Sequence, residues 1–205
     1  MKILLLSAFL LAGLGASAAT PPDTVAAPPV ARKWYRPHHL AVQTGGGLGL
    51  VAAGAGYAFF RDRLETDILI GYVPKRYASS TLSLASLKVM YSPFQLPVAE
   101  RVQVQPLTVG AYFSYTHGTI NDELKGQYSK DYYWFSTDTR FGALVGGRVS
   151  YLAAPVAATG QPRKLSFYYE LGTNDLYAVS YFTNMHGGLH LGQILTLALG
   201  VKADF

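Results

Sequence analysis

Ser114 and His117 are the residues whose types could support nucleophilic hydrolysis, and the acidic residues Asp122 and Glu123 follow them closely. A serine becomes a nucleophile only when a base and an orienting acid lie beside it. Side chains alternate across a strand, so an offset of three would place Ser114 and His117 on opposite faces. The spacing therefore favours a strand-end serine next to a loop histidine. We assign no catalytic residue and keep this pair as the alternative.

Two further patterns could hold a metal ion or a phosphate group. His186 and His190 are four residues apart, but Gly187 and Gly188 between them argue against a helix that would align the two imidazoles. Four glycines between positions 45 and 49 resemble a phosphate loop, yet no Lys-Ser or Lys-Thr pair follows. They favour a flexible first hairpin or close strand packing. We therefore predict no metal site and no cofactor.

Eight charged residues stand on one face of segments whose other face is apolar. Four are acidic and four basic: Glu65, Asp67, Lys88, Arg140, Arg148, Glu170, Lys202 and Asp204. Isolated charges are very costly away from water, so residues of both signs on an enclosed face must pair. The pattern predicts an interior ion-pair network that holds the structure together. A gated or ion-conducting path is the alternative.

Eight alternating segments position these charges and predict β-strands. They cover residues 40–47, 51–60, 64–73, 81–91, 102–116, 139–151, 165 onward and 195–205. The seventh continues, or is interrupted, through Phe182. We expect a bulge or membrane boundary near Leu84 and Ala85, a proline-containing turn over 92–97, and the longest polar insertion over 117–137. An even number of antiparallel strands predicts an all-β, closed, up-and-down transmembrane β-barrel.

The composition fits a barrel in a membrane. Tyr (15), Phe (10) and Gly (21) are abundant, charged residues make up only 14%, and no stretch after the start is long enough for a transmembrane helix. The chain has no Cys, which excludes disulfides, thiolate metal sites and a lipid-modified cysteine. A net charge of +5 is compatible with lipopolysaccharide phosphates and does not argue for nucleic acid.

The start of the chain has the features of an exported protein. A positive start, an apolar run over 3–14 and the small residues Ala16 and Ala18 predict a signal peptide over 1–18. Residues 19–37 are proline-rich and predict a periplasmic leader without a core. His38 and His39 follow it and are expected at an interface or in solvent. A soluble periplasmic β-protein is the other destination that this signal allows.

The final segment carries the most specific signal. Leu197, Leu199, Val201 and Phe205 share one face of a strand, and the chain stops on the aromatic residue. With eight strands, this ending resembles the small Gram-negative outer-membrane barrels of the OmpA and OmpX type, over residues 38–205. The resemblance implies an outer-membrane location, contact with lipid and lipopolysaccharide, and assembly by the barrel machinery through the last strand. We expect a monomer.

The preferred function is a non-enzymatic structural or interaction role, without a porin channel. A lipid-modifying enzyme, of the lipid A deacylase or acyltransferase type, is the alternative, although the His-x-Ser-Asn element associated with the deacylases is absent. A carrier for small hydrophobic molecules is the third. A cluster of aromatic residues is expected at the headgroup level, or as a binding surface for a glycan, lipid or protein: Tyr128, Tyr132, Tyr133, Trp134 and Phe135.

Overall fold

The computed structural model describes residues 35–118, 138–155, 163–183 and 190–205. Within these ranges the chain forms strands β1 (His39–Gly45), β2 (Val51–Phe59), β3 (Leu64–Val73), β4 (Leu82–Tyr91), β5 (Leu96–Ala99), β6 (Val102–His117), β7 (Thr139–Ala153), β8 (Arg163–Asn174) and β9 (Thr196–Asp204), with helices α1 (Asp175–Thr183) and α2 (Leu191–Ile194). Neither helix is long and apolar enough to cross a membrane. The predicted signal peptide and most of the leader lie outside the described residues.

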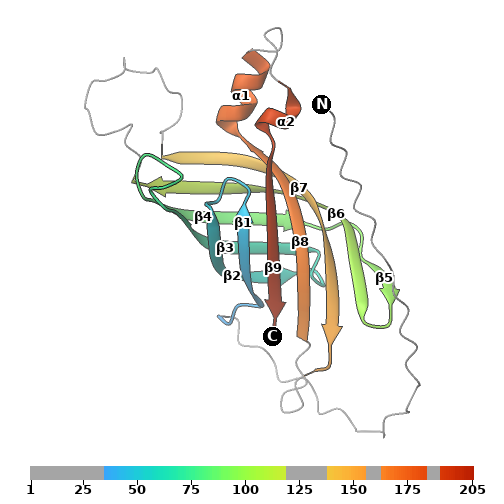
Figure 1. Cartoon of the computed structure of the whole chain (residues 1–205). Coiled ribbons are helices and arrows are strands. Elements are labelled where there is room, and N and C mark those ends of the chain that lie inside the picture. Colours follow the sequence, from blue (N-terminus) through green and yellow to red (C-terminus); the bar gives the residue numbers. More distant parts are fainter. Residues whose placement is uncertain (1–34, 119–137, 156–162, 184–189) are drawn as a thin grey trace, which may run out of the picture.

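Eight of the strands close into an antiparallel barrel (Figure 1). β1 pairs with both β2 and β9, so the first and last strands complete the ring. β4 pairs with β6, and β5 lies outside the ring, paired along β6. The prediction of an all-β, closed, eight-stranded antiparallel barrel is confirmed. Closure leaves no ring strand with an unpaired edge.

The two ends of the barrel differ. One end, which we call the terminal end, carries His39, Asp204, the turn at 60–63 and the start of β8. The opposite, helical end carries α1 and α2 between β8 and β9. The seventh predicted strand is therefore interrupted by helix α1, which was one of the two outcomes expected for residues 165–182.

β5 continues β4 along the same partner strand. Tyr91 faces Val109 and Leu96 faces Val104, so residues 92–95 interrupt one long hairpin that turns between Ala99 and Val102. The predicted turn over 92–97 is wrong in part, because Leu96 and Pro97 already pair with β6. At the terminal end, β5 lies beyond the last pair between β3 and β4, which is Leu64 with Tyr91.

Two alternatives were predicted near Leu84 and Ala85: the bulge is wrong, and the membrane boundary stays a prediction. The register of β4 runs without a break from Ser83 to Tyr91 against β6, and it is equally regular against β3. The apolar pattern changes there because Leu84 is buried on the inner face. A register shift occurs instead in β6, between Gln105 and Thr108, where Pro106 has no N–H to donate to the ladder.

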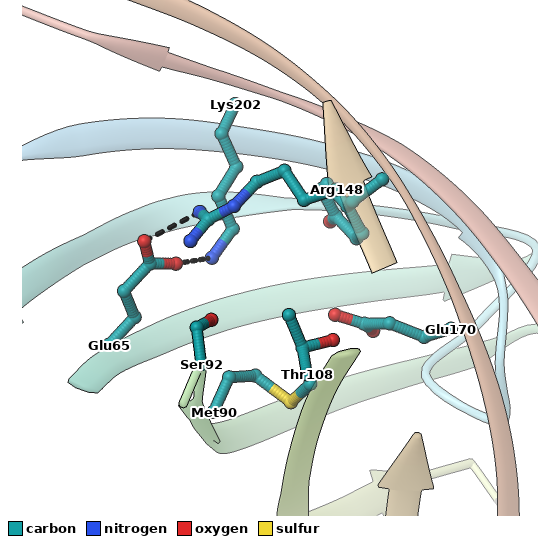
Figure 2. Close-up of a pocket in the computed structure, with 8 residues that line it drawn as sticks. Glu65, Met90, Ser92, Thr108, Arg148, Glu170 and Lys202 are labelled. Atoms are coloured by element: carbon teal, nitrogen blue, oxygen red, sulfur yellow. Dashed lines mark hydrogen bonds and ion pairs between the residues drawn. The ribbon is translucent and has the colours of Figure 1, made fainter. Parts of the chain in front are cut away.

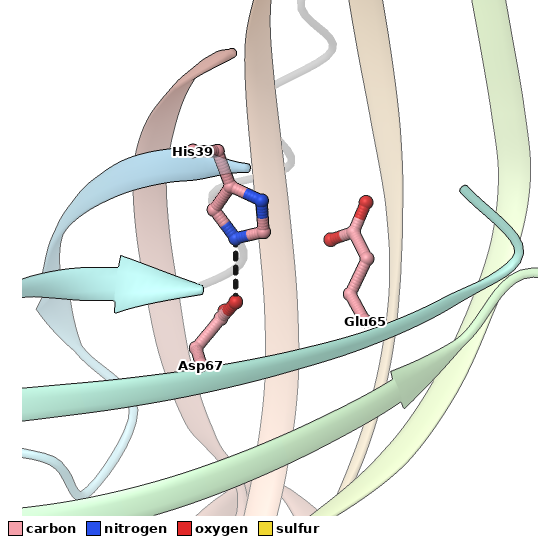
Figure 3. A group of neighbouring side chains, drawn as sticks. All are labelled: His39, Glu65 and Asp67. Atoms are coloured by element: carbon pink, nitrogen blue, oxygen red, sulfur yellow. Dashed lines mark hydrogen bonds and ion pairs between the residues drawn. The ribbon is translucent and has the colours of Figure 1, made fainter. Parts of the chain in front are cut away.

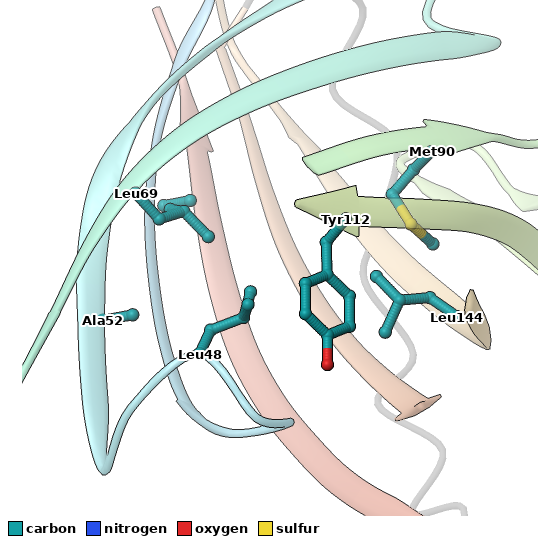
Figure 4. Packing of buried hydrophobic residues seen from close by; sticks show 7 residues of the cluster. Leu48, Ala52, Leu69, Met90, Tyr112 and Leu144 are labelled. Carbon is teal, nitrogen blue, oxygen red and sulfur yellow. The ribbon is translucent and has the colours of Figure 1, made fainter. Parts of the chain in front are cut away.

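An apolar cluster fills part of the lumen (Figure 4). It consists of Ala41, Leu48, Ala52, Leu69, Met90, Tyr112 and Leu144. Leu48 belongs to the turn between β1 and β2 and is 1% exposed, so the turn folds inward. Gly45, Gly46, Gly47 and Gly49 have positive φ values, which glycine adopts at little cost. A Cβ atom on Gly45 would lie 2.3 Å from the Leu197 carbonyl oxygen. Of the two explanations predicted for these glycines, the structure therefore favours close packing over a flexible hairpin.

Candidate functional site

Six of the eight charged residues predicted for the interior lie together in the lumen, and all are buried: Glu65, Asp67, Lys88, Arg148, Glu170 and Lys202. They come from β3, β4, β7, β8 and β9, which surround the lumen. On each strand the neighbouring residues point outward, so strand alternation alone directs these side chains inward. We call these six residues the charged network (Figure 2 shows four of them).

Lys202 links two carboxylates from the same strand. Its Nζ lies 2.6 Å from Glu65 Oε2 and 2.8 Å from Asp67 Oδ2. The second Glu65 oxygen, Oε1, lies 2.5 Å from Arg148 Nη1. Figure 2 shows the Glu65 carboxylate between the Arg148 guanidinium and the Lys202 ammonium. Short contacts of this kind are charge-assisted and stronger than hydrogen bonds between neutral groups.

Lys88 forms the second centre of the network. Its Nζ donates to both carboxylate oxygens of Glu170, at 3.0 and 3.2 Å, and to Gln43 Oε1 at 2.9 Å. It also lies 3.5 Å from Asp67 Oδ2, which joins the two centres. Lys88 Nζ stands 4.8 Å from the centre of the Tyr168 ring, and Lys202 Nζ stands 5.6 Å from it. This aromatic face adds a cation–π contact to each ammonium.

The charged network is balanced in sign. Three carboxylates, Glu65, Asp67 and Glu170, oppose three cations, Lys88, Arg148 and Lys202. Buried charges cost several kcal/mol each unless they are paired and hydrogen-bonded, so equal numbers are what an enclosed lumen requires. Five strands contribute to one connected set, and the ion pairs therefore tie opposite walls of the barrel together.

His39 belongs to this interior and not to an interface or solvent as predicted. It is 0% exposed, and its Nε2 lies 2.6 Å from Asp67 Oδ1 (Figure 3). The prediction is wrong because Leu40 and Val42 point outward, which places His39 on the inner face of β1. The alternation contained this signal, but the predicted strand began one residue later.

His39, Glu65 and Asp67 together have the donor types of a metal site. One ligand atom from each lies within 4.8 Å of the others. Lys202 Nζ contacts both carboxylates of this group, so a buried cation already supplies the positive charge. A metal ion would have to displace Lys202 from two ion pairs. The arrangement therefore favours a structural cluster.

The remaining two predicted charges lie apart from the charged network. Asp204 is near the terminal end, where its Oδ1 is 3.7 Å from Lys164 Nζ and 3.9 Å from His39 Nδ1. Arg140 is half-buried on β7 and donates from Nη1 to the carbonyl oxygen of Thr139 at 2.7 Å. The prediction did not include Lys164, because the predicted strand began one residue later, at Leu165.

Neutral polar side chains complete the interior. Gln105 Oε1 accepts from Arg148 Nε at 2.5 Å and from Ser92 Oγ at 3.3 Å. Tyr168 donates its hydroxyl to Gln43 Oε1 at 3.0 Å. The cavity lined by Ser92, Thr108 and their charged neighbours has a free volume of about 10 Å³, roughly what one water molecule requires. The lumen beside the charged network is thus filled.

The alternative catalytic pair is not assembled. Ser114 is 1% exposed on the inner face of β6, whereas the side chain of His117 is exposed at the end of the same strand. A proton cannot pass directly between groups on opposite sides of a barrel wall. Other predicted features lie outside the described residues: Asp122, Glu123, His186 and the aromatic cluster Tyr128, Tyr132, Tyr133, Trp134 and Phe135.

The residues expected to carry the assembly signal are exposed on the outer face of the barrel: Leu197, Leu199, Val201 and Phe205. Comparison with protein-family models, curated proteins and solved structures found no match for the chain. What the molecule can do must therefore be inferred from its geometry. That geometry combines an apolar outer face with a paired, charged and filled interior.

Proposed function

We propose that this chain is an integral β-barrel protein of the Gram-negative outer membrane, with a structural or interaction role and no enzymatic activity of its own. The observation that carries the proposal is the inverted distribution of side chains. Charges are buried inside the ring, while Ile68 and Ile70 on β3, and Leu197 and Leu199 on β9, are each more than half exposed outside it. A soluble barrel has the opposite arrangement.

Aromatic residues support a position in a bilayer. Near the terminal end the outer face carries Phe59, Tyr91 and Tyr151, and near the helical end it carries Tyr72, Tyr115 and Phe141. Membrane barrels carry an apolar band between two such aromatic girdles, because these rings prefer the headgroup level. The two longest connections between ring strands, residues 118–138 and 175–195, leave from the helical end, which favours a periplasmic location for the terminal end.

Lipid accounts for the exposed apolar surface. Soluble monomers rarely expose contiguous apolar patches larger than a few hundred Å². The outward apolar residues here occur on every ring strand, so they surround the barrel instead of forming one patch. The closed ladder satisfies the backbone groups that hydrocarbon could not hydrogen-bond.

The filled lumen argues against a solute channel and against a carrier with an apolar interior. The charged network and the apolar cluster occupy the space that a porin leaves open. The remaining roles belong to the outer surface and the loops, which can contact lipid, lipopolysaccharide or a partner protein. The outer face of β9 would present the assembly signal to the barrel machinery.

Fractionation and gel migration test the proposal together. We expect the chain in the outer-membrane fraction, resistant to extraction with alkaline carbonate, and faster-migrating before boiling than after it, because closed barrels resist detergent unfolding. A chain released by carbonate, with one mobility, would contradict the membrane assignment. Mass spectrometry of lipid A and phospholipids, with and without overproduction, tests the enzymatic alternative, and expression-dependent loss or gain of an acyl chain would overturn the non-enzymatic role.

A further inference from the structure

Exposed arginines gather at the terminal end of the barrel. Five of the nine arginines of the chain stand there with exposed side chains: Arg36, Arg61, Arg63, Arg101 and Arg163. Backbone contacts place them on one rim, since Ser92 donates to the Arg63 carbonyl and Leu152 to the Arg101 carbonyl, while Arg163 pairs with Ala153. We call these five residues the arginine rim.

The carboxylates of this end do not neutralise the arginine rim. Asp62 is held by Lys164 at 2.8 Å, and Asp204 lies near Lys164 and His39. Of the Asp and Glu side chains in the described ranges, none forms an ion pair within 4.0 Å with a rim guanidinium. Among the described residues of this end, and counting Lys164, six cationic side chains lie with three acidic side chains, Asp62, Glu100 and Asp204, so the side chains of the rim carry a surplus of positive charge.

Apolar side chains accompany the rim. Phe60, next to Arg61, is 75% exposed. Phe94 is 56% exposed and lies beside the hairpin whose turn contains Arg101. Leu96 and Val98 on β5 are exposed as well, although they lie beyond the ring. Aromatic and aliphatic residues interleaved with cations are typical of surfaces at the headgroup level of a bilayer.

The helical end lacks a comparable group in the part that the structure describes. Its exposed cations are Lys75 and Arg76, on the connection between β3 and β4. Arg76 is close to an aromatic ring, 5.6 Å from the centre of Tyr77. Because the surplus is specific to one end of the described barrel, a role in general solubility does not explain it.

We propose that the arginine rim binds the phosphates of anionic phospholipid headgroups in the leaflet that surrounds the terminal end. This inference depends on the proposed membrane location and specifies the lipid that the barrel selects. All exposed Lys and Arg side chains at the terminal end of the described barrel are arginines. A guanidinium can bind a phosphate through two parallel hydrogen bonds, which an ammonium cannot. Cations close to an anionic membrane surface are attracted to it, and salt screens this attraction.

Lipid retention by the refolded full chain tests the proposal. The barrel is purified in neutral detergent micelles containing equal amounts of dioleoylphosphatidylglycerol and dioleoylphosphatidylcholine, and bound lipids are counted by native mass spectrometry. We expect at least a tenfold preference for phosphatidylglycerol, weakened by salt. Combined substitution Arg61→Gln, Arg63→Gln, Arg101→Gln and Arg163→Gln should reduce this preference by about tenfold. The matched control, Lys75→Gln with Arg76→Gln, should retain it.

Three results would overturn the proposal: no preference in the wild type, an unchanged preference in the fourfold variant, or an equal loss in the control. A preference for lipopolysaccharide that the fourfold variant loses would also overturn it, because the rim would then face the other leaflet. Glycerol phosphate added in solution should not compete with the lipid, and full competition would assign the rim to soluble phosphates instead.

Folding is measured separately, so the two proposals can fail independently. Every variant is first checked for the shift in gel mobility on boiling, and the double variant Arg61→Gln, Arg101→Gln replaces the fourfold one should that chain not fold. If the wild type inserts into membranes but shows no lipid preference, the proposed function stands and the proposal that the arginine rim binds anionic phospholipids is overturned. A wild type that does not insert overturns both.

Discussion

The charged network and the apolar cluster fill the same lumen by different physical means. In the network, Lys202 touches Glu65 and Asp67, and each ion is tolerated only because its partners are in place. In the cluster, Leu48, Leu69 and Leu144 fill volume and require no specific partner. The network should therefore be sensitive to the loss of one charge, and the cluster to the loss of volume.

Removing one cation from the network should produce the largest effect. Lys202→Met leaves Glu65 and Asp67 with one cation fewer in a buried site, and we expect a loss of about 3–5 kcal/mol in the free energy of unfolding. Urea titration of the barrel in phospholipid vesicles measures it. The double variant Glu65→Gln, Lys202→Met should lose at least about 1 kcal/mol less than the sum of the single variants. Additive losses would contradict the coupling.

Loss of volume in the apolar cluster should lower the free energy of unfolding somewhat less than loss of a charge in the network. Leu48→Ala removes a side chain that is 1% exposed, and we expect about 2–4 kcal/mol from lost burial and the remaining cavity. Leu50 lies on the same turn but is exposed, so Leu50→Ala is the matched control and should change stability by less than about 0.5 kcal/mol. Equal losses in both variants would show that Leu48 does not fill the lumen as described.

The turn that carries Leu48 should respond to backbone strain. Gly45 has a φ of +76°, and an added Cβ would meet the Leu197 carbonyl oxygen at 2.3 Å. Gly45→Ala should therefore cost about 1–3 kcal/mol. Gly192→Ala adds the same methyl group where no atom lies within 4 Å, and it should be nearly neutral by the same urea titration. Equal losses of stability in the two variants would contradict the conclusion that the turn folds inward because Gly45 adopts a positive φ.

The difference between the charged network and the apolar cluster also explains which interior residues the sequence predicts. Strict alternation in β3 identifies Glu65 and Asp67 as inward residues, because a period of two is independent of the fold around it. Which cation meets which carboxylate depends on the register of distant strands, as for Lys88 with Glu170. No local pattern contains that information.

The apolar cluster is harder to predict than the charged network. Leu48 lies in a glycine-rich turn, and turn residues are expected on the surface. The positive φ values of the glycines let the turn fold inward, where Leu48 packs in the apolar cluster. Leu84 misleads for a related reason, since a leucine that points into the lumen interrupts the alternation of apolar and polar residues without breaking the strand.

The smallest effect on the free energy of unfolding is expected for the ion pair between Lys164 and Asp62, at the terminal end of the barrel. Lys164 contacts Asp62, whose side chain is 46% exposed, and lies 3.7 Å from Asp204. Solvent can stabilise Asp62 when its partner is lost, so Lys164→Met should cost about 1 kcal/mol or less by the urea titration used for Lys202→Met. Both substitutions remove one lysine and create the same side chain, so their difference isolates the effect of enclosure. A loss as large as that of Lys202→Met would mean that the charged network extends to the rim as one energetic unit.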